Sequence, residues 1–591
     1  MDAKVKNYAG WQSDVIVDCI KRYGFPHITL NPGASFRGLH DSLVNYGEND
    51  PPMMLCNHEE IAVQIAHGYA KASGKPMVVI LHNLVGLLHA CMAIYYAFLD
   101  RVPIFIMGAT GPMDEARRRP HIDWTHTALV QGNAVRDYTK WDYQPTSIHG
   151  VPESFARAYS IMMTEPKGPI YMCYDAALQE DPLIDKVELP PAEAVKQPSP
   201  MAPDPAAIEA IADKLIKSEN PMILTEYTGR QEGNFDKLVT LAETAGAAVW
   251  DVNNALNFPN KHPLCLSMDK PSLKKLDLIV GLDLKDWEKQ LTLLNRTTRT
   301  LEVLPPKTCD YVEIGVAEIG ISKWAMDYCR FQPCSVRALG DTSLAMPELT
   351  RIIKAKVDSN SNLKKKIEDR KIAIGKRHDE VWAQWQKDAR KDWDASPLTF
   401  QRLAMEVWEA IKDEDWVLTA NDLKHEVRKY WDFDKPYRHP GVELGTSTQI
   451  GISLGVALAH RDKKRLVVDI QPDGDLMFDA GALWVAAKYQ IPMLVVMHNN
   501  RAYYNDWAHQ IRMAKLRGTD EAKAHIGMDL FGPEPDFGAL ARSLGCYGEG
   551  PIDKPEDVGP ALRRAIAEVK KGRLALVDTI TQHKGGSTSG D

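Results

Sequence analysis

The chain has 591 residues, of which 44% are hydrophobic and 25% charged, and its formal net charge is −8. This is an ordinary globular composition, and the length predicts about three domains. The acidic balance argues against a general nucleic-acid binder. No apolar run reaches the roughly 18–20 residues that cross a bilayer. We therefore expect neither nucleic acid nor a membrane among its partners.

The N-terminal segment and the cysteines bear on the cellular compartment. The first residues, MDAKVKNYAGWQSDVIVDCI, lack the apolar core of a signal peptide. The nine cysteines are odd in number and form no CxxC pair, so neither a disulfide framework nor a zinc site is expected. These features predict a cytoplasmic protein with free thiols.

Residues 1–188 form the first predicted domain. Strands are expected at ITLNPG (28–33), MMLCNH (53–58) and MVVIL (77–81), and a helix that ends at Gly74 follows the second of them. Strands separated by helices are typical of parallel sheets with right-handed crossovers.

The second predicted domain, 189–362, repeats this pattern. It opens with residues 189–205, which carry six prolines and predict an extended linker. The loop GRQEG at 229–233 does not match G-x-G-x-x-G, so we predict no FAD. Strands are expected within 221–227, 247–252 and 276–284, and a helix at about 234–245.

A charged segment separates the second and third domains. Residues 363–394 mix charges with scattered Trp and Ile, which predicts an exposed helix crossing between domains. The third domain, 395–591, has strand-like segments at 415–420, 466–470, 493–498 and 575–580. The whole chain is therefore predicted to be α/β, with three doubly wound parallel-sheet domains.

Two polar residues follow two of the strands in the third domain. Asp473 comes after LVVDI and Asn500 after MLVVMH, 27 residues later, which fits a loop, a helix and a strand. Ligands of parallel α/β sheets bind beyond the carboxyl ends of the strands. A carboxylate and an amide oxygen suit Mg²⁺, and Gly474 with the following helix start suits a phosphate. This predicts a Mg²⁺–diphosphate site; the alternative is an ordinary βαβ unit with polar loop ends.

The spacing resembles the cofactor motif of thiamine diphosphate (ThDP) enzymes, which is GDG, then a helix and a strand, then NN. The stretch GALWVAAKYQIP before MHNN is especially similar to benzoylformate decarboxylase and acetolactate synthase-like proteins. The resemblance implies the cofactors ThDP and Mg²⁺. It also implies Asp473, Asn500 and the backbone carbonyl of Ala502 as metal ligands.

The motif departs from the family at two positions. Pro472 replaces the first glycine of GDG, but it precedes the metal ligand, so the site should survive. Asp475 follows Gly474 where a small hydroxyl residue is common. An acidic side chain beside a diphosphate is unfavourable unless it points away or holds a cation.

The first domain contains CNHEEIAVQIAHGYAKASGKPMVVIL, which looks like the family's pyrimidine-side signature. In these enzymes a glutamate binds N1′ of the pyrimidine and favours the imino tautomer that forms the C2 ylid. A buried glutamate with a raised pKa can share that proton. The family's offset from Gly68 selects Glu59, whereas Glu60 is favoured at the helix start by the dipole.

Residues 444–457, LGTSTQIGISLGVA, align with another family segment. There, a bulky apolar side chain wedges between the two cofactor rings, and this position falls on Ile450. The carbonyl of Thr448 would accept from the 4′-amino group. Together with Glu59, Asp473, Gly474, Asp475 and Asn500, these two residues complete the implied cofactor-binding set.

The segment VILHNLVGLLHA resembles the decarboxylase segment with a catalytic histidine, which falls on His82. A histidine beside the thiazolium can move protons near neutral pH, and Asn83 could hydrogen-bond a substrate oxygen. The alternative for His82 is a core histidine at a strand end. Further candidates for substrate contacts are Ala34 and Ser35 in NPGASF, His58 (or a helix cap), His121, His126, Tyr503 and Tyr504.

The implied activity is a lyase that decarboxylates a 2-oxo acid, with aromatic substrates favoured, through the C2 ylid and an enamine, and with carboligation as a second activity. Alternatives are an acetolactate synthase-like transferase and a lyase that cleaves a 2-hydroxy ketone or acyl-CoA without losing CO₂. A cofactor-binding scaffold without activity is a further alternative, because fold alone proves no activity.

The resemblance also implies an assembly. Residues 1–188 would bind the pyrimidine, 395–591 the diphosphate, and the central block would be the non-catalytic Rossmann-like domain. In the family, the pyrimidine-binding domain of one subunit faces the diphosphate-binding domain of another. We therefore expect a homodimer at least, and commonly a homotetramer, with Glu59 and Asp473 meeting at a subunit interface.

Overall fold

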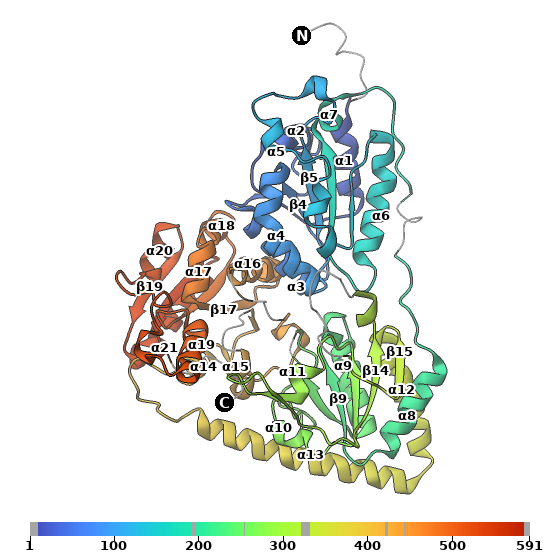
Figure 1. Cartoon of the computed structure of the whole chain (residues 1–591), viewed down its shortest axis with the longest axis vertical. Coiled ribbons are helices and arrows are strands. Elements are labelled where there is room, and N and C mark those ends of the chain that lie inside the picture. Colours follow the sequence, from blue (N-terminus) through green and yellow to red (C-terminus); the bar gives the residue numbers. More distant parts are fainter. Residues whose placement is uncertain are drawn as a thin grey trace.

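The computed structural model describes residues 10–191, 197–252, 254–320, 331–419, 424–441, 445 and 447–583 (Figure 1). Three parallel sheets follow one another along the chain, which confirms the predicted α/β class. Each segment predicted as a strand contains one. In Figure 1 the first domain lies at the top, the central domain at the lower right and the third domain at the left.

The first domain is built on a six-stranded sheet with the order β3-β2-β4-β5-β7-β6, all paired in parallel. Helices α1 (Gln12–Arg22) and α6 (Val151–Met163) pack on one face of the sheet. Helices α3 (Glu59–Ser73) and α4 (Asn83–Leu99) pack on the other. The strands are β2 (Ile28–Leu30), β3 (Met53–Leu55), β4 (Val78–Leu81), β5 (Phe105–Thr110), β6 (Trp141–Tyr143) and β7 (Ile170–Asp175).

Two local signals define α3, the helix that carries the predicted catalytic glutamate. The side chain of His58 caps its first turn by accepting the Glu60 N–H at 3.2 Å. Gly74 ends it in the left-handed conformation, with φ of 71°. The predicted end at Gly74 is confirmed.

The central domain has a five-stranded parallel sheet with the order β10-β9-β11-β14-β15. The predicted helix is α9 (Asn234–Ala245), with the same bounds. The strands are β9 (Pro221–Thr225), β10 (Ala248–Asp251), β11 (Leu278–Leu282), β14 (Asp310–Gly315) and β15 (Val336–Leu339), and the other main helices are α8 (Pro205–Lys217), α10 (Lys270–Leu273) and α12 (Thr342–Asp358).

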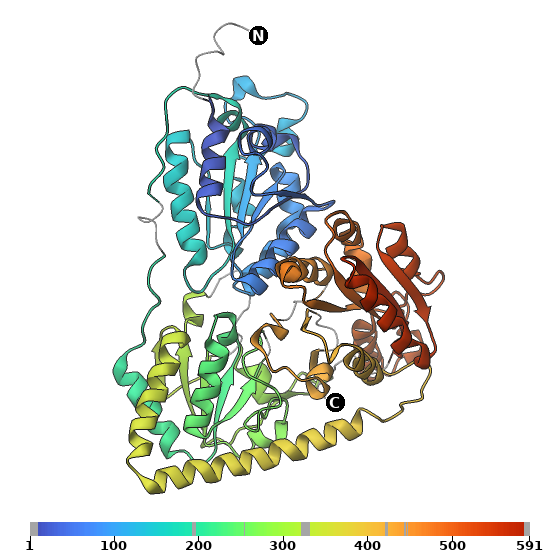
Figure 2. The same ribbon diagram turned by 180° about the vertical axis from the view of Figure 1, so that it is seen from behind.

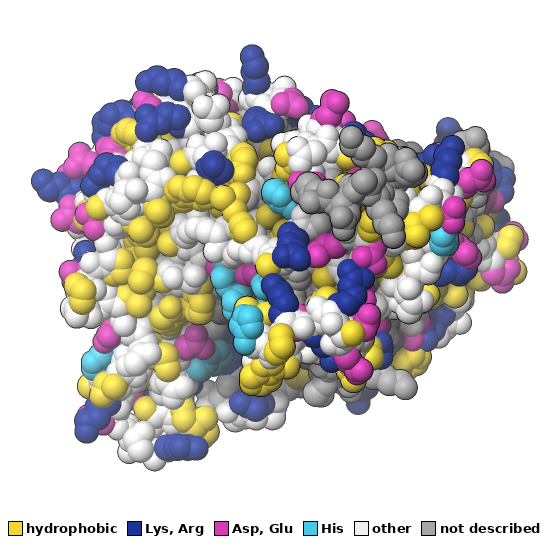
Figure 3. Space-filling view, turned by 90° about the horizontal axis from the view of Figure 1, so that it is seen from above, with side chains coloured by type: hydrophobic (Ala, Val, Ile, Leu, Met, Phe, Trp, Pro, Cys, Tyr) yellow, Lys and Arg dark blue, Asp and Glu magenta, His cyan; other side chains and the backbone are white. Residues whose placement is uncertain are grey.

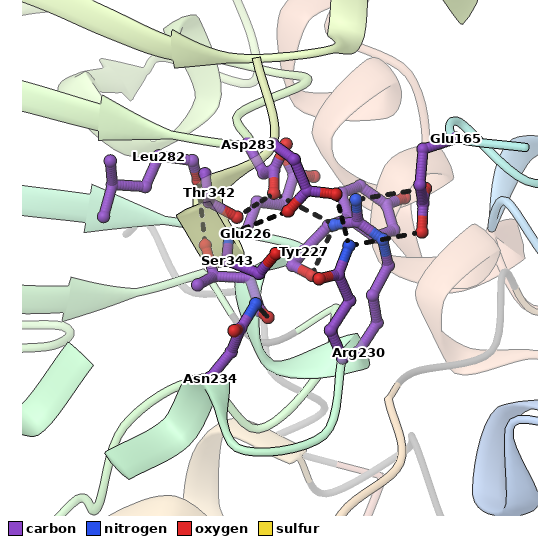
Figure 4. A network of polar contacts seen from close by, with 12 residues as sticks. Glu165, Glu226, Tyr227, Arg230, Asn234, Leu282, Asp283, Thr342 and Ser343 are labelled. Atoms are coloured by element: carbon purple, nitrogen blue, oxygen red, sulfur yellow. Dashed lines mark hydrogen bonds and ion pairs between the residues drawn. The ribbon is translucent and has the colours of Figure 1, made fainter. Parts of the chain in front are cut away.

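A polar network fills the point where the strand order of this sheet reverses, between β9 and β11 (Figure 4). Arg230, from the loop after β9, contacts Asp283, which follows β11, and Glu165 of the first domain, each at 3.1 Å. The Thr342 hydroxyl donates to Asp283 at 2.6 Å. This switch point is where doubly wound sheets usually bind ligands. Here its two loops are tied to each other and to the first domain.

The third domain has the sheet order β16-β17-β18-β20-β19, again all parallel. All seven residues of β18 are buried, as expected for a strand covered on both faces. The strands are β16 (Trp416–Leu418), β17 (Leu466–Pro472), β18 (Met493–Asn499), β19 (Tyr547–Ile552) and β20 (Leu574–Ile580); the main helices are α14 (Phe400–Ile411), α15 (Lys424–Tyr430), α16 (Gln449–His460), α17 (Asp473–Asp479), α18 (Ala482–Lys488), α19 (Tyr504–Arg517), α20 (Phe537–Ser543) and α21 (Pro555–Val569).

The charged segment between the central and third domains is mostly helical. Helix α13 (Ser361–Asp388) runs along the base of the molecule from one domain to the other (Figure 2). It is shorter than the predicted segment 363–394 at its C-terminal end, and residues Ile367, Arg370 and His378 are buried, so it is not exposed on all sides. In the linker 189–205, the described residues form no helix or strand before α8 begins at Pro205.

The first and third domains pack directly on each other within the chain, through α3 and α16. A single hydrophobic core contains residues of both helices. Glycines allow the close approach: a Cβ atom at Gly68 would overlap the Ile452 carbonyl oxygen, and one at Gly455 would overlap the Ile65 carbonyl oxygen. Among the described helices, none is long and apolar enough to cross a membrane.

We expect Gly68→Ala to lower the midpoint of thermal unfolding, at a cost of about 2–3 kcal/mol, because the added methyl group meets the backbone of α16. The matched control is Gly375→Ala in α13, where a Cβ atom would make only ordinary contact with Pro263 at 3.6 Å. The control should hold or raise the midpoint, since Ala favours a helix over Gly. Equal midpoints for the two variants would contradict the packing argument.

Candidate active site

The two adjacent glutamates at the start of α3 face different neighbours. Glu59 is buried and faces α4 of its own domain, where its Oε2 lies 3.1 Å from Nδ1 of His89. Glu60 lies near Asp479 of the third domain. Glu59 and Glu60 are adjacent in the chain, but their side chains point to different domains.

Three residues, Gly86, His89 and His58, lie around the Glu59 carboxylate. A Cβ atom at Gly86 would lie 2.9 Å from Glu59 Oε1, so the glycine leaves the room that the carboxylate occupies. His89 lies one turn after Gly86 on α4, and its ring stacks on that of His58 with centroids 5.1 Å apart. Sequence reasoning missed His89. The signal was the spacing of Gly86 and His89, which places them on one face of a helix.

His82 lies between the end of β4 and the start of α4. Its Nδ1 lies 2.9 Å from the Ser35 hydroxyl, and its ring lies over the backbone of Gly33, where a Cβ atom would overlap it. The His126 ring packs edge-on against it at 5.7 Å. Burial lowers the pKa of His82, and the neighbouring His126 lowers it further. A neutral imidazole near pH 7 can accept a proton.

Asn83, the first residue of α4, has an unusual environment. It is 1% exposed, and both polar atoms of its side chain are buried without a hydrogen-bond partner among the described residues. Its φ of 34° is in the left-handed region, which is strained for a residue other than glycine. Its backbone N–H donates to Ser35 Oγ at 3.2 Å. An unsatisfied amide beside Ser35 and His82 is the kind of group that a ligand would satisfy.

Asp473 and Asn500 lie at adjacent strand ends, as predicted. Pro472 of β17 pairs with His498 of β18, so the residues that follow each strand are neighbours. The Ala502 N–H lies 3.0 Å from Asn500 Oδ1 and 3.3 Å from Asp473 Oδ2. The three proposed metal ligands are therefore grouped. Helix α17 begins at Asp473 itself, without the intervening loop that the sequence suggested.

Gly474 and Asp475 have partners within the domain. The Tyr503 ring packs where a Cβ atom of Gly474 would lie, and its hydroxyl donates to the Gly474 carbonyl at 3.3 Å. Asp475 accepts from the Ser447 N–H at 2.5 Å and the Gln471 amide at 3.1 Å. These two hydrogen bonds hold the Asp475 side chain against Ser447, before α16, and Gln471 of β17.

The segment at the start of α16 is held from inside the domain. Gln449 donates to Asp469 and to the Ile470 carbonyl, and the Thr448 hydroxyl donates to the Gly445 carbonyl. Ile450 is fully buried in the core shared with α3. The cofactor contacts proposed for Thr448 and Ile450 stay predictions; residues 442–444 and 446 lie outside the described residues.

A second group of side chains joins the domains and was not anticipated. The Gln64 amide donates to the Ser447 carbonyl at 2.7 Å and to Asp479 Oδ2 at 2.9 Å. Burial first, and then the nearby Asp479 charge, raise the pKa of Glu60 to about 7. Burial also raises the pKa values of Asp475 and Asp479. This edge of the third domain is rich in carboxylates.

The remaining candidates divide between the site and the surface. Ser35, not the exposed Ala34, contacts His82, and His126 rather than the exposed His121 packs on it. His58 acts as the cap of α3. Tyr504 stacks on His583 at 5.8 Å, away from the Gly474 contact made by Tyr503.

The comparisons with known proteins match both halves of this site. The model described as "Thiamine pyrophosphate enzyme, N-terminal TPP binding domain" matches residues 11–131, and the one described as "Thiamine pyrophosphate enzyme, C-terminal TPP binding domain" matches residues 423–579. The chain belongs to the thiamine pyrophosphate enzyme family. Thiamine pyrophosphate is the same compound as ThDP.

The relatives of this thiamine pyrophosphate enzyme include proteins with different named functions. The probable acetolactate synthase large subunit of Methanocaldococcus jannaschii is 21% identical, covering 96% of this chain and 91% of its own. Benzoylformate decarboxylase of Pseudomonas aeruginosa is 23% identical, covering 96% and 98%. The crystal structure of benzoylformate decarboxylase from Polynucleobacter necessarius shares the fold, with a TM-score of 0.75 at 18% identity over 97% and 99% of the chains.

The residues of this thiamine pyrophosphate enzyme fit the cofactor. The third domain offers the oxygen donors that Mg²⁺ prefers, grouped at one sheet edge. The first domain offers a buried glutamate and, at Asn83, an amide whose polar atoms have no partner among the residues that the structure describes.

The pKa of Glu60 predicts a pH dependence of stability. The pKa of Glu60 is about 7 in the folded protein, above its ordinary value of 4.5, so the folded state binds this proton more tightly than the unfolded state. The stability that Glu60 contributes is therefore lost as the pH rises from about 4.5 to about 7. Glu60→Gln stays neutral and should flatten that part of the profile. The measurement is the thermal midpoint of the cofactor-free protein between about pH 5 and pH 8.

The control for this measurement is Glu153→Gln, whose side chain is 82% exposed and paired only at 3.9 Å with Arg157. It should leave the wild-type profile in place. A Glu60→Gln profile parallel to the wild type would mean that Glu60 titrates at its ordinary pKa in the folded protein.

Proposed function

We propose that this protein is a ThDP- and Mg²⁺-dependent carbon–carbon lyase that removes CO₂ from a 2-oxo acid. The observation that carries the proposal is the grouping of Asp473, Asn500 and Ala502 in one family domain together with a buried Glu59 in the other. When bound, ThDP supplies the electron sink on which a 2-oxo acid loses its carboxylate.

The third domain would hold the cofactor through the metal. Asp473 and Asn500 would bind Mg²⁺ through their side-chain oxygens and Ala502 through its carbonyl oxygen. In the first domain, Glu59 would hold the proton at N1′ of the pyrimidine. Gly86 keeps space for its carboxylate and His89 contacts Oε2, so the carboxylate is restricted to one orientation.

His82 and Asn83 would act on the substrate. His82 is held by Ser35 and is neutral near pH 7, so it can take up and return a proton at the reacting carbon. The amide of Asn83 would donate to a substrate oxygen, since both its polar atoms lack partners among the described residues. The polar character around them favours a substrate with an acidic group.

Two other reactions use the same parts. An acetolactate synthase-like transferase, which condenses two 2-oxo acids, is favoured by the acetolactate synthases among the relatives. A lyase that cleaves a 2-hydroxy ketone or acyl-CoA would need the same cofactor site. The fate of the bound substrate after CO₂ loss distinguishes them, and aldehyde, acyloin and acetohydroxy acid are different products.

Exposed apolar side chains support the expected oligomer. Leu88 and Met92 on α4 are 55% and 42% exposed, and they flank His89; Met477 and Phe478 on α17 are 49% and 54% exposed, just after the Asp473 motif. Figure 3 shows hydrophobic side chains over a wide part of one face, with histidines at a hollow beside them. Such patches beside both half-sites favour burial by a second subunit, as a homodimer or homotetramer.

The first test is release of CO₂ from benzoylformate by the protein reloaded with ThDP and Mg²⁺. We expect Glu59→Gln to lower the rate about 10²-fold or more, because the variant has no carboxyl proton to hold at N1′. Glu60→Gln is the matched control, since Glu60 faces the third domain of its own chain, and it should keep most of the rate. Loss in Glu60→Gln but not in Glu59→Gln would reverse the assignment.

The amount of CO₂ that the wild type releases tests the proposed substrate class. Release of CO₂ would assign aromatic 2-oxo acids as substrates, and the product would identify the fate after CO₂ loss. If the wild type releases no more CO₂ than Glu59→Gln does, the proposal that the protein decarboxylates benzoylformate is wrong. Pyruvate condensation then becomes the reaction to assay.

His89 gives a separate prediction as a positioning residue. His89→Ala removes the partner of Glu59 Oε2 and should lower kcat about tenfold with little change in KM, whereas His89→Asn keeps a donor and should restore part of the rate. His121→Ala, at an exposed site, is the control. A rate for His89→Ala equal to that of His121→Ala would show that the contact with Glu59 has no catalytic role.

A further inference from the structure

A large cavity lies far along the chain from both half-sites, between α13 and the central domain. Its volume is about 820 Å³, which is within the range of small-molecule sites. One wall is α13, from Asn362 to Glu380. The other wall includes Pro221 and Ala248, the first residues of β9 and β10. The cavity is therefore at the amino ends of these strands, opposite the switch point that Arg230 fills.

Helix α13 is fixed over this cavity by side chains along its length. Arg370 is 7% exposed, and its guanidinium donates to the carbonyls of Leu215, Ser218 and Ala245, at the ends of α8 and α9. Arg377 makes a two-bonded ion pair with Asp269, at 2.7 and 2.9 Å. These contacts hold the helix away from the sheet edge, so the cavity is a built feature of the fold.

A third contact strengthens this attachment. The ring of His378 lies 2.8 Å from the Cys265 carbonyl through Nδ1, and burial lowers the pKa of His378, so the ring is a neutral donor. Lys366 pairs with Glu219 at 2.7 Å at the opposite end of the cavity. The cavity therefore has fixed walls at both ends.

The lining combines apolar surface with an excess of basic over acidic side chains. Two of the basic side chains, the exposed Lys275 and Lys365, have no hydrogen bond or ion pair within the part of the chain that the structure describes. The Arg370 Nε is buried and also without a partner there. The apolar lining residues are Pro221, Ala248, Leu266, Pro271, Leu276, Ala373 and Ile374; the charged ones are Lys275, Lys365, Lys366, Arg370, Arg377, Glu219, Asp369 and Glu380.

We propose that this cavity is a binding site for an organic anion with an apolar body, such as an aromatic or medium-chain carboxylate or sulfonate. The apolar wall would bury the body, and Lys275 and Lys365 would face the acidic group. A small inorganic anion would leave the apolar wall uncovered, and a neutral hydrocarbon would leave the lysines without a partner. The site does not depend on the proposed catalytic activity.

The probe is 8-anilinonaphthalene-1-sulfonate, which joins an aromatic body to a sulfonate, titrated by fluorescence into the full chain loaded with ThDP and Mg²⁺. We expect one saturable site per chain that octanoate displaces and octanol does not. Lys275→Glu with Lys365→Glu should weaken that binding at least tenfold. Ala373→Trp, on the cavity side of α13, should weaken it as much by filling the space.

Lys376→Glu is the matched control, since Lys376 is exposed on the same helix but does not line the cavity, and it should leave binding unchanged. Thermal midpoints of all variants confirm that each is folded. The proposal is wrong if Ala373→Trp binds the probe as the wild type does, or if octanol competes as well as octanoate. Because catalysis is not read out, these outcomes are independent of the CO₂ assay.

Discussion

The close packing of α3 on α16 is the constraint on which the arrangement of the site depends. Glycines at Gly68 and Gly455 let the two helix backbones approach, so the first and third domains share one core. That contact directs Gln64 and Glu60 toward Asp479 of the same chain. Glu59, one residue earlier, is left facing α4. The two adjacent glutamates of α3 are therefore directed to different domains by the same helix contact.

Local signals explain why much of the fold could be predicted from the sequence. Apolar runs such as 466–470 and 493–498 identify buried parallel strands, and the spacing of Asp473 and Asn500 follows from the geometry of a βαβ unit. The contact of Glu59 with His89 was not predicted from the sequence, and neither was the position of His126, rather than His121, on His82. Those contacts depend on how separate elements pack, which periodicity does not encode. The contact of α13 with the central domain through Arg370 was missed for the same reason.

Different titratable side chains surround Glu59 in the first domain and Asp473 in the third domain. Around Glu59 lie the imidazoles of His58 and His89, whereas the edge of the third domain gathers Asp473, Asp475 and Asp479. Burial raises the pKa values of Asp475 and Asp479, so holding these carboxylates ionised costs free energy. Asp475 is turned back to the Ser447 amide. A diphosphate near Asp473 would therefore not meet the Asp475 charge directly, and a divalent cation would compensate that of Asp473.

Arginine side chains attach the central domain to other parts of the chain at both edges of its sheet. At the switch point, Arg230 pairs with Asp283 and Glu165, and the pair with Glu165 attaches the central domain to the first domain. At the opposite sheet edge, Arg370 and Arg377 attach α13 without filling the space beneath it. The same residue type thus serves two ends of one sheet, because a guanidinium can bridge several acceptors at once. Since α13 leads from the central domain towards the third domain, a ligand beneath it would contact the segment that connects these two domains.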